Sequence, residues 1–168
     1  MSFLYTVGNG RLPGVRWMAR RRTIRDWQER WDRIEDKAQW TKRLIPDIGG
    51  WVDCKFRTTN YYFTEFLTGH GSYFTYTCRI KKTRTDLCGE CEVPDSPEHT
   101  IFSCKRWSNE RKAAWKKLGR VVNADTLLGE MMKTREKWRA GYEYIVDIMK
   151  RKEVEDRMRQ QEEGNNME

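Results

Sequence analysis

The 168-residue sequence lacks any apolar run of the roughly 18 residues that a membrane span needs, and its first residues lack the continuous hydrophobic stretch of a secretory signal. These absences predict an intracellular protein, nuclear or cytoplasmic, that has no contact with a membrane. Histidine is scarce, with two residues, and the five cysteines are an odd number with three of them clustered. Such a set does not suit a secreted disulfide framework, so it favours metal ligation in a reducing compartment.

Charge and large aromatic side chains, by contrast, are abundant. Charged residues make up 35% of the chain, which also holds eight tryptophans and seven tyrosines. The net charge of +8 lies within residues 1–87, because residues 88–168 contain equal numbers of basic and acidic side chains. The basic residues are grouped in stripes, which suit a polyanion, and nucleic acid is the commonest polyanion inside cells.

The length of the chain and the spacing of its apolar residues predict one small, mainly α-helical domain. Composition and periodicity distinguish five consecutive regions. They are a flexible basic N-terminal segment (1–22), a helical region (23–87), a cysteine-rich segment (88–104), the C-terminal helices (105–159) and a disordered tail (160–168).

Local signals predict the boundaries of several elements in the first half. An amphipathic helix is expected from about residue 23, an irregular segment over 47–57, and a second helix over 59–68 that ends at Gly69. Residues 73–80 fit both a helix and a strand, and the neighbouring pattern favours the helix.

The second half is predicted to contain three helices after the cysteine-rich segment. The first covers residues 105–118, and Asp125 is expected to cap a short second one. A long final helix begins near Thr134 and becomes charged beyond Lys150, which predicts a solvated helix end.

The cysteine-rich segment, CGECEVPDSPEHTIFSC, has the spacing of a metal site. Its four ligand-type residues are Cys88, Cys91, His99 and Cys104. Two cysteines separated by two residues can turn back so that both thiolates reach one ion, and Gly89 is predicted to give the backbone freedom for this turn. Ser96 and Pro97 are typical of a helix start, which places His99 in the opening turn.

A Cys3His ligand set is one that structural Zn²⁺ uses, and four protein ligands leave no position for a reactive water. The sequence therefore predicts a central Cys3His zinc knuckle that stabilises the fold. A zinc deaminase is not indicated, because there a His-x-Glu precedes the cysteine pair. The alternative is that buried thiols lie by chance near a surface histidine. Cys54 and Cys78, outside the cluster, are predicted to be buried free thiols.

Several motifs resemble a known family. LTGHGSYFTYTCRI (67–80), CGEC, PEHTIFSCKRW and NERKAAW are together similar to the region that follows the polymerase domain, at the C-terminus, in reverse transcriptases of non-LTR (LINE-type) retrotransposons, especially those of insects. The resemblance extends from Trp27 to Arg159. It implies a zinc-knuckle tail that helps the enzyme to hold template RNA and target DNA, with the same four zinc ligands and a structural role for residues 67–71.

Two departures qualify what this resemblance implies. Retroviral-type knuckles place four residues before the histidine where this chain has seven, so their way of binding single-stranded RNA is not expected. The catalytic aspartate pair of such polymerases is absent, because no two aspartates are adjacent in the chain. The protein is therefore expected to be no enzyme by itself, and to be a domesticated tail or a fragment of a longer polyprotein.

The residues predicted to contact nucleic acid are basic and lie before the first helix and on both sides of the cysteine cluster. They are Arg20, Arg21, Arg22, Arg79, Lys81, Lys82, Arg84, Lys105, Arg106, Arg111, Lys112, Lys116 and Lys117. Residues 16–25 are alternatively a solvated arm without a partner. Trp107 and Trp115 suit base stacking, but their spacing along one helical side favours core packing.

Two functions remain open from the sequence. The first is a zinc-stabilised nucleic-acid-binding accessory module that contacts template RNA or target DNA through its basic stripes. The second is a zinc-stapled helical scaffold that docks against protein, such as a reverse transcriptase polymerase domain, and has no direct nucleic-acid role.

Overall fold

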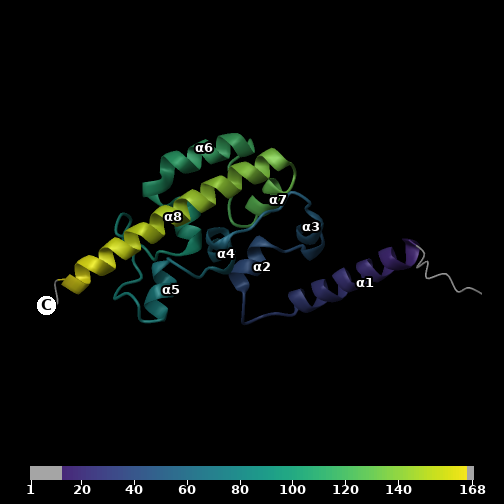
Figure 1. Ribbon diagram of the computed structural model, residues 1–168, viewed down its shortest axis with the longest axis horizontal. Coiled ribbons are helices and arrows are strands. Elements are labelled where there is room, and N and C mark those ends of the chain that lie inside the picture. Colours follow the sequence, from purple (N-terminus) through teal and green to yellow (C-terminus); the bar gives the residue numbers. More distant parts are fainter. Residues whose placement is uncertain (1–12, 166–168) are drawn as a thin grey trace, which may run out of the picture.

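The computed structural model describes residues 13–165 and is mainly helical, as the sequence predicts (Figure 1). Its elements are α1 (Pro13–Asp32), α2 (Gln39–Leu44), α3 (Ile48–Asp53), α4 (Tyr61–Thr68), α5 (Phe74–Arg79), the π-helical turn η1 (His99–Ser103), the 3-10 turn η2 (Lys105–Trp107), α6 (Ser108–Leu118), α7 (Leu127–Met131) and α8 (Arg135–Asn165). Between residues 13 and 165 no strand forms, and Leu87 and Pro94 make an isolated antiparallel bridge. Over the same residues, no helix combines the length and the apolar character that crossing a bilayer requires.

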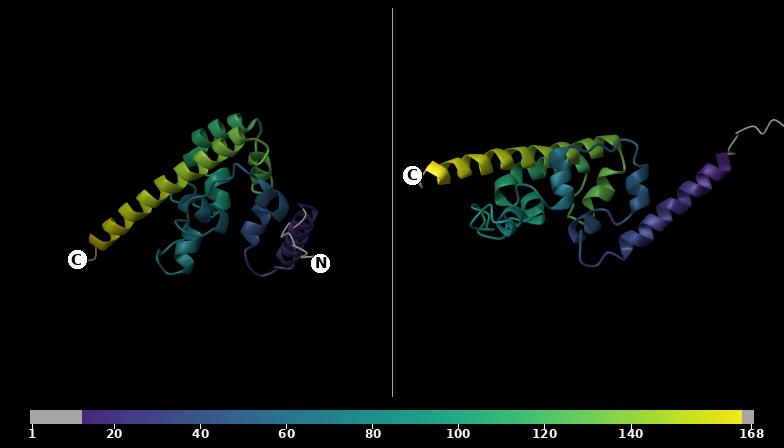
Figure 2. Two further views of the ribbon diagram at one scale, coloured as in Figure 1. Left: turned by 45° about the vertical axis from the view of Figure 1, so that its right-hand side comes forward. Right: turned by 60° about the horizontal axis from the view of Figure 1, so that its bottom comes forward.

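The long helix α8 is the axis of the fold, because α4, α6 and α7 all pack against it (Figures 1 and 2). Trp138, Ile145 and Ile148 of α8 are buried in this contact, at the helical spacing that the sequence shows. The facing helices contribute Phe63, Phe66, Leu118, Leu127, Leu128 and Met131. Full burial of a side chain of this kind contributes roughly 1.5–3 kcal/mol, so α8 organises the main hydrophobic core.

Aromatic side chains fill much of this core. Phe63 lies 5.7 Å from Trp138 and 5.9 Å from Phe66, measured between ring centroids. Trp107 and Trp115 are both buried, and the Trp115 ring lies 5.4 Å from that of Tyr144 in an edge-on arrangement. Core packing of these two tryptophans is therefore confirmed, which removes them as base-stacking residues.

Helix α4 is stabilised at its two ends by a polar side chain and a glycine. The Asn60 side chain accepts a hydrogen bond of 2.9 Å from the Phe63 N–H, which caps the start of α4. Gly69 ends α4 in the left-handed region, at φ 70°. The helical interpretation of residues 73–80 is confirmed by α5, and the strand alternative is wrong.

Several predicted boundaries are wrong. The first helix begins at Pro13 and not near residue 23, because proline suits the first helical position and arginine and alanine favour helix. A short helix, α3, lies within residues 47–57, where an irregular segment was expected. Asp125 does not cap α7, because it accepts a hydrogen bond of 2.7 Å from Arg43.

The predicted disordered tail, 160–168, includes the last residues of α8 and three residues that the structure does not describe. Helix α8 continues to Asn165, while residues 166–168 lie outside the described residues. Of the predicted flexible segment 1–22, residues 1–12 also lie outside them.

Helix α1 lies against the rest of the molecule through its C-terminal half and projects away from it at the other end (Figures 1 and 2). The Trp31 indole N–H donates to the Ile45 carbonyl at 2.8 Å. The Gln28 amide bridges two backbone groups, donating to the Pro46 carbonyl at 2.8 Å and accepting from the Ile48 N–H at 2.9 Å. These contacts fix the direction of α1 relative to α3.

The charged end of α8 is not the solvated helix end that the sequence predicts. Lys152 is 7% exposed and Asp156 is 9% exposed, so both lie inside the protein. Burial of a charged side chain is costly unless a partner compensates it. The partner of Lys152 belongs to the cysteine-rich segment.

Candidate metal centre

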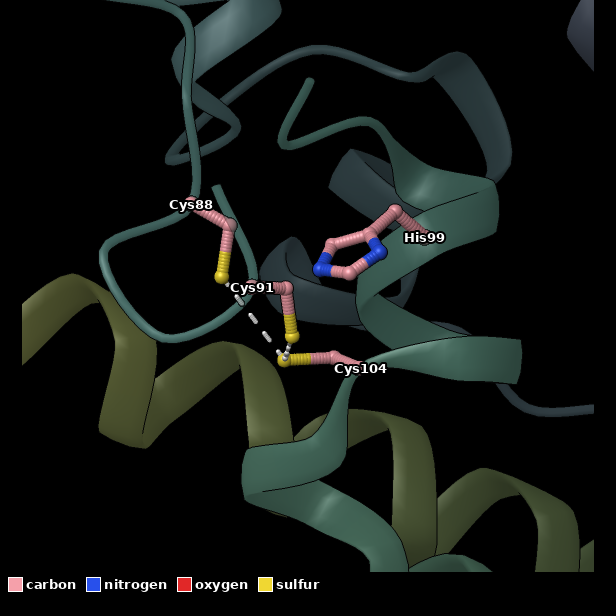
Figure 3. A group of neighbouring side chains, drawn as sticks. All are labelled: Cys88, Cys91, His99 and Cys104. Atoms are coloured by element: carbon pink, nitrogen blue, oxygen red, sulfur yellow. Dashed lines mark hydrogen bonds between the residues drawn. The ribbon is translucent and has the colours of Figure 1, made fainter. Parts of the chain in front are cut away.

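The four predicted ligands come together in space. The sulfurs of Cys88, Cys91 and Cys104 and a ring nitrogen of His99 all lie within 4.8 Å of one another, and Figure 3 shows the side chains pointing toward a common centre. The Cys104 sulfur lies 3.8 Å from that of Cys88 and 3.9 Å from that of Cys91. The alternative of chance thiols beside an unrelated histidine therefore does not describe this site. The cluster has the geometry to bind a metal ion.

The first two ligands lie in a tight loop whose ends are held together by backbone hydrogen bonds. The Cys88 N–H donates to the Val93 carbonyl, and the Glu92 N–H donates back to the Cys88 carbonyl, both at 2.8 Å. Glu92 adopts the left-handed conformation, with φ 58°, whereas Gly89 has no positive φ. The prediction that Gly89 supplies the special conformation is therefore wrong, because the turn reverses at Glu92.

The other two ligands are positioned by a short helix with a wide last turn. Ser96 accepts a hydrogen bond of 3.1 Å from the His99 N–H, which confirms the predicted helix start. The Cys104 N–H then donates to the His99 carbonyl at 2.7 Å, a five-residue separation typical of a π-helix. This turn brings the side chains of residues five apart to the same site.

The position and the protonation state of the His99 imidazole suit a metal ligand. Its Nε2 atom is buried and has no hydrogen-bond partner among the described residues, and Figure 3 shows one ring nitrogen facing the sulfurs. The other nitrogen, Nδ1, lies 3.4 Å from the Ser103 hydroxyl, which can orient the ring. Burial lowers the pKa of His99, so the ring is neutral near pH 7 and Nε2 can donate a lone pair to a metal.

The surroundings of the sulfurs, in contrast, favour the protonated thiol when no cation is bound. Burial raises the pKa of the Cys104 thiol to about 12, the Arg106 backbone hydrogen bond opposes this rise, and the nearby Cys88 sulfur adds to it. The Lys105 N–H points at the Cys91 sulfur, at 3.4 Å. Three thiolates this close repel one another, so a bound cation is the natural way to hold them deprotonated.

We call residues 88–104 the metal loop. Asp95, which is 2% exposed, anchors it to the rest of the protein. Its carboxylate accepts hydrogen bonds from the Phe74 N–H at 3.0 Å and the Thr100 hydroxyl at 2.7 Å. The same carboxylate forms a buried ion pair with Lys152 of α8. The loop is thereby held against both α5 and α8.

Two more hydrogen bonds join the second half of the metal loop to its neighbours. The buried Tyr144 hydroxyl of α8 donates to the Ile101 carbonyl at 2.7 Å. The half-buried Arg111 side chain of α6 donates to the Cys104 carbonyl at 2.8 Å. No role was predicted for Asp95, Lys152 or Tyr144, because no local pattern in the sequence marks them.

The residues predicted to contact nucleic acid do not all have the same surroundings. Some are engaged within the protein: Arg20 pairs with Asp53, Arg106 pairs with Glu155, and Arg111 donates to the metal loop. Arg21 and Arg79 lie over the rings of Trp17 and Tyr76, respectively. The lysines are all exposed, and none of them forms an ion pair with a side chain that the structure describes; they are Lys81, Lys82, Lys105, Lys112, Lys116 and Lys117. Arg22 and Arg84 are exposed too.

The two cysteines outside the cluster, Cys54 and Cys78, form no disulfide, as predicted, but their side chains are half-buried and not buried. Neither lies in the group that could hold a metal. The cluster therefore contains every cysteine of the metal loop and no other.

Comparison with curated proteins finds similarity to a retrovirus-related Pol polyprotein from the type-1 retrotransposable element R1 4 of Nasonia vitripennis. The two sequences are 25% identical over 85 residues, which make up 51% of this chain and 22% of the polyprotein. The match thus spans about a fifth of the length of that relative. No family model matches the chain, and no solved structure matches it. The similarity agrees with the predicted relation to retrotransposon Pol proteins.

Proposed function

We propose that this protein is a zinc-stabilised nucleic-acid-binding module, derived from the C-terminal region of an insect-like retrotransposon reverse transcriptase and without catalytic activity of its own. The observation that carries the proposal is the convergence of three cysteines and one histidine in a segment that exposed lysines flank in the sequence. The similarity to a Pol polyprotein supports the origin. Nucleic acid, RNA or DNA, is the proposed partner.

Zn²⁺ is the metal that fits the site best. With sulfur about 2.3 Å from the ion, a tetrahedral site places neighbouring sulfurs about 3.8 Å apart. The two sulfur–sulfur distances at Cys104, 3.8 and 3.9 Å, agree with this value. Soft thiolates with one imidazole also favour zinc over magnesium or calcium. Because the protein fills all four positions, the zinc supplies stability and not a reactive water.

The proposed binding surface consists of the exposed lysines that flank the metal loop. Lys105 follows the last ligand directly and its N–H points at the Cys91 sulfur, so the zinc would fix where this charge lies. Lys81 and Lys82 precede the metal loop, and their N–H groups bond to the Cys78 and Thr77 carbonyls of α5. Lys112, Lys116 and Lys117 continue the charge along α6. Lysines contact phosphates and so position a nucleic acid without reading its sequence.

Fluorescence anisotropy tests this proposal with structured RNA, single-stranded DNA and duplex DNA, each titrated over a range of salt concentrations. We expect affinity to fall steeply as salt rises, because every phosphate contact releases counterions. The variant Lys81→Glu/Lys82→Glu should weaken binding to any ligand that the wild type binds.

The control is Lys37→Glu/Lys55→Glu, which changes the charge equally at two exposed residues away from the metal loop in the sequence. Equal losses in the two double variants would contradict the proposed surface. Weak binding that ignores both variants would instead support the alternative function, a zinc-stapled scaffold that docks against protein.

A further inference from the structure

The projecting end of α1 is rich in exposed arginines, which the stability of the helix does not require. We call residues 15–25 the α1 arm. It contains five arginines and no acidic residue, and all five arginine side chains are exposed. In Figures 1 and 2 the start of α1 lies away from the other helices. Among the side chains that the structure describes, Arg20 alone of these five has an ion-pair partner, Asp53.

Helix stability would favour a different arrangement. The N-terminal end of a helix carries partial positive charge, so acidic side chains stabilise it and basic ones do not. Arg16 with Arg20, and Arg21 with Arg25, are like charges four residues apart, which repel each other on one helical face. The position of Arg16 and the spacing of the two like-charged pairs therefore weaken the helix, although arginine itself has a high helix propensity. An external anion would compensate for both effects.

Trp17 adds a second chemistry to the same surface. Its side chain is 57% exposed, and the Arg21 guanidinium lies 4.7 Å from the centre of its ring. A surface hollow of about 280 Å³ is lined by Trp17, Met18, Arg21, Arg22 and Arg25. An exposed indole thus lies beside three guanidinium groups along roughly 12 Å of helix, at 1.5 Å per residue.

We infer that the α1 arm binds single-stranded nucleic acid, with an unpaired base stacked on Trp17 and the adjoining phosphates on Arg21, Arg22 and Arg25. The inference rests on the proposed nucleic-acid-binding function and adds a second, structurally separate contact surface to it. Planar guanidinium groups match phosphate oxygens in a paired, two-bond geometry. An indole face gains from a base only when that base is not already stacked within a duplex.

The positive charge of the α1 arm favours a nucleic acid over a protein as the partner of this surface. Trp17 and Met18 are exposed apolar residues of a kind that also occurs in protein interfaces. However, Arg21, Arg22 and Arg25 around them form no ion pair with a side chain that the structure describes. An apolar protein surface would leave these cations buried and uncompensated. A polyanion with flat apolar faces satisfies both parts of the surface.

The test uses the full chain and two ligands of equal length, an oligouridine RNA and the same phosphodiester chain with abasic sites in place of the bases. Trp17→Ala should weaken binding of the base-bearing RNA by about ten-fold, since stacking on one aromatic residue is worth roughly that factor. It should leave binding of the abasic chain almost unchanged. Trp17→Phe should retain most of the affinity.

The phosphate contacts have their own readout. For a single strand each contact contributes about 0.7 to the slope of log affinity against log salt. Arg21→Gln/Arg22→Gln should therefore reduce that slope by about 1.4. It should weaken binding of the base-bearing and abasic ligands to the same extent.

Trp27→Ala is the matched control, because Trp27 is 50% exposed on the same helix but does not line the hollow. An equal loss for Trp17→Ala and Trp27→Ala, or a Trp17→Ala loss that is the same with and without bases, would overturn the inference. If the wild type binds while Trp17 has no influence, this inference fails alone. If the wild type binds no nucleic acid, the proposed function fails as well.

Discussion

The metal loop and the α1 arm are both polar and charged, yet they are attached to the protein by different chemistry. The metal loop is held by the buried Asp95–Lys152 pair, by the Tyr144 hydroxyl and by its own cluster of ligands. Helix α1 is held by exposed or half-buried hydrogen bonds near its C-terminal end and by one surface ion pair. The difference teaches that similar charged side chains can have opposite uses. Those of Asp95 and Lys152 hold the fold together from inside, whereas the arginines of the α1 arm stay exposed at the surface.

The largest expected effect is that of removing a metal ligand. Cys104→Ser, or treatment with a chelator, should destabilise the protein by several kcal/mol, because structural zinc contributes about 10 kcal/mol in small metal-dependent domains. Thermal unfolding followed by circular dichroism measures the change. Cys54→Ser and Cys78→Ser are the controls, since both residues are free and lie outside the cluster. Comparable losses in all three variants would show that the cluster holds no metal.

The next effect is that of breaking the buried pair. Asp95→Ala should cost about 3–5 kcal/mol, because it leaves the Lys152 ammonium buried without its partner. Glu155 lies on α8, as Lys152 does, and forms a more exposed ion pair with Arg106. Glu155→Ala removes this pair and should cost less than about 1 kcal/mol. Chemical denaturation measures both. Similar values for the two variants would contradict the special role of Asp95 in holding the metal loop.

A smaller and local effect is expected at the base of α1. Gln28→Ala removes three hydrogen bonds, two of which join α1 to the backbone of Pro46 and Ile48, and should cost about 1–2 kcal/mol. Because α1 projects from the core, amide exchange should become faster in α1 while α8 stays protected. Hydrogen exchange with mass spectrometry distinguishes the two helices. Equal acceleration in both would mean that α1 and the core unfold as one unit.

The smallest expected effect concerns the surface ion pair of α1. Both side chains of Arg20–Asp53 are more than half exposed, so Arg20→Ala should cost about 0.2–1 kcal/mol. Salt screens such a pair, and the difference between variant and wild type should shrink as ionic strength rises. Denaturation curves at low and high salt provide the measurement. A cost that persists in high salt would indicate that Arg20 also packs against α3.

The convergence of the three cysteines and the histidine could be predicted from the sequence because their spacing is local. Cys88 and Cys91 belong to one turn, and His99 and Cys104 to another, so short-range geometry determines each pair. The helices that pack on α8 were likewise visible as apolar residues at three- and four-residue steps. Pro13, the signal for the true start of α1, was present too, but three glycines and the lack of periodicity in residues 1–15 favoured a flexible segment.

What anchors the metal loop could not be predicted in this way. Asp95 and Lys152 are 57 residues apart, and each has the ordinary surroundings of a solvated charge in the sequence. Their burial depends on α8 passing beside the loop, which is a property of the packed molecule. The conformation of Glu92 was missed for a related reason, since glycine is the expected residue at a positive φ and Gly89 lies close by.

The length of α8 has a consequence for where this protein may be shortened. A chain cut after Lys150 would keep every sulfur and imidazole of the metal loop, as well as the apolar residues of the core. It would nevertheless lose the ammonium group on which the Asp95 carboxylate depends. The smallest fragment that keeps this anchor must therefore extend at least to Lys152, which lies beyond Met149, the last buried apolar residue of α8 among the described residues. A search for sequence motifs would place the end of the fragment too early.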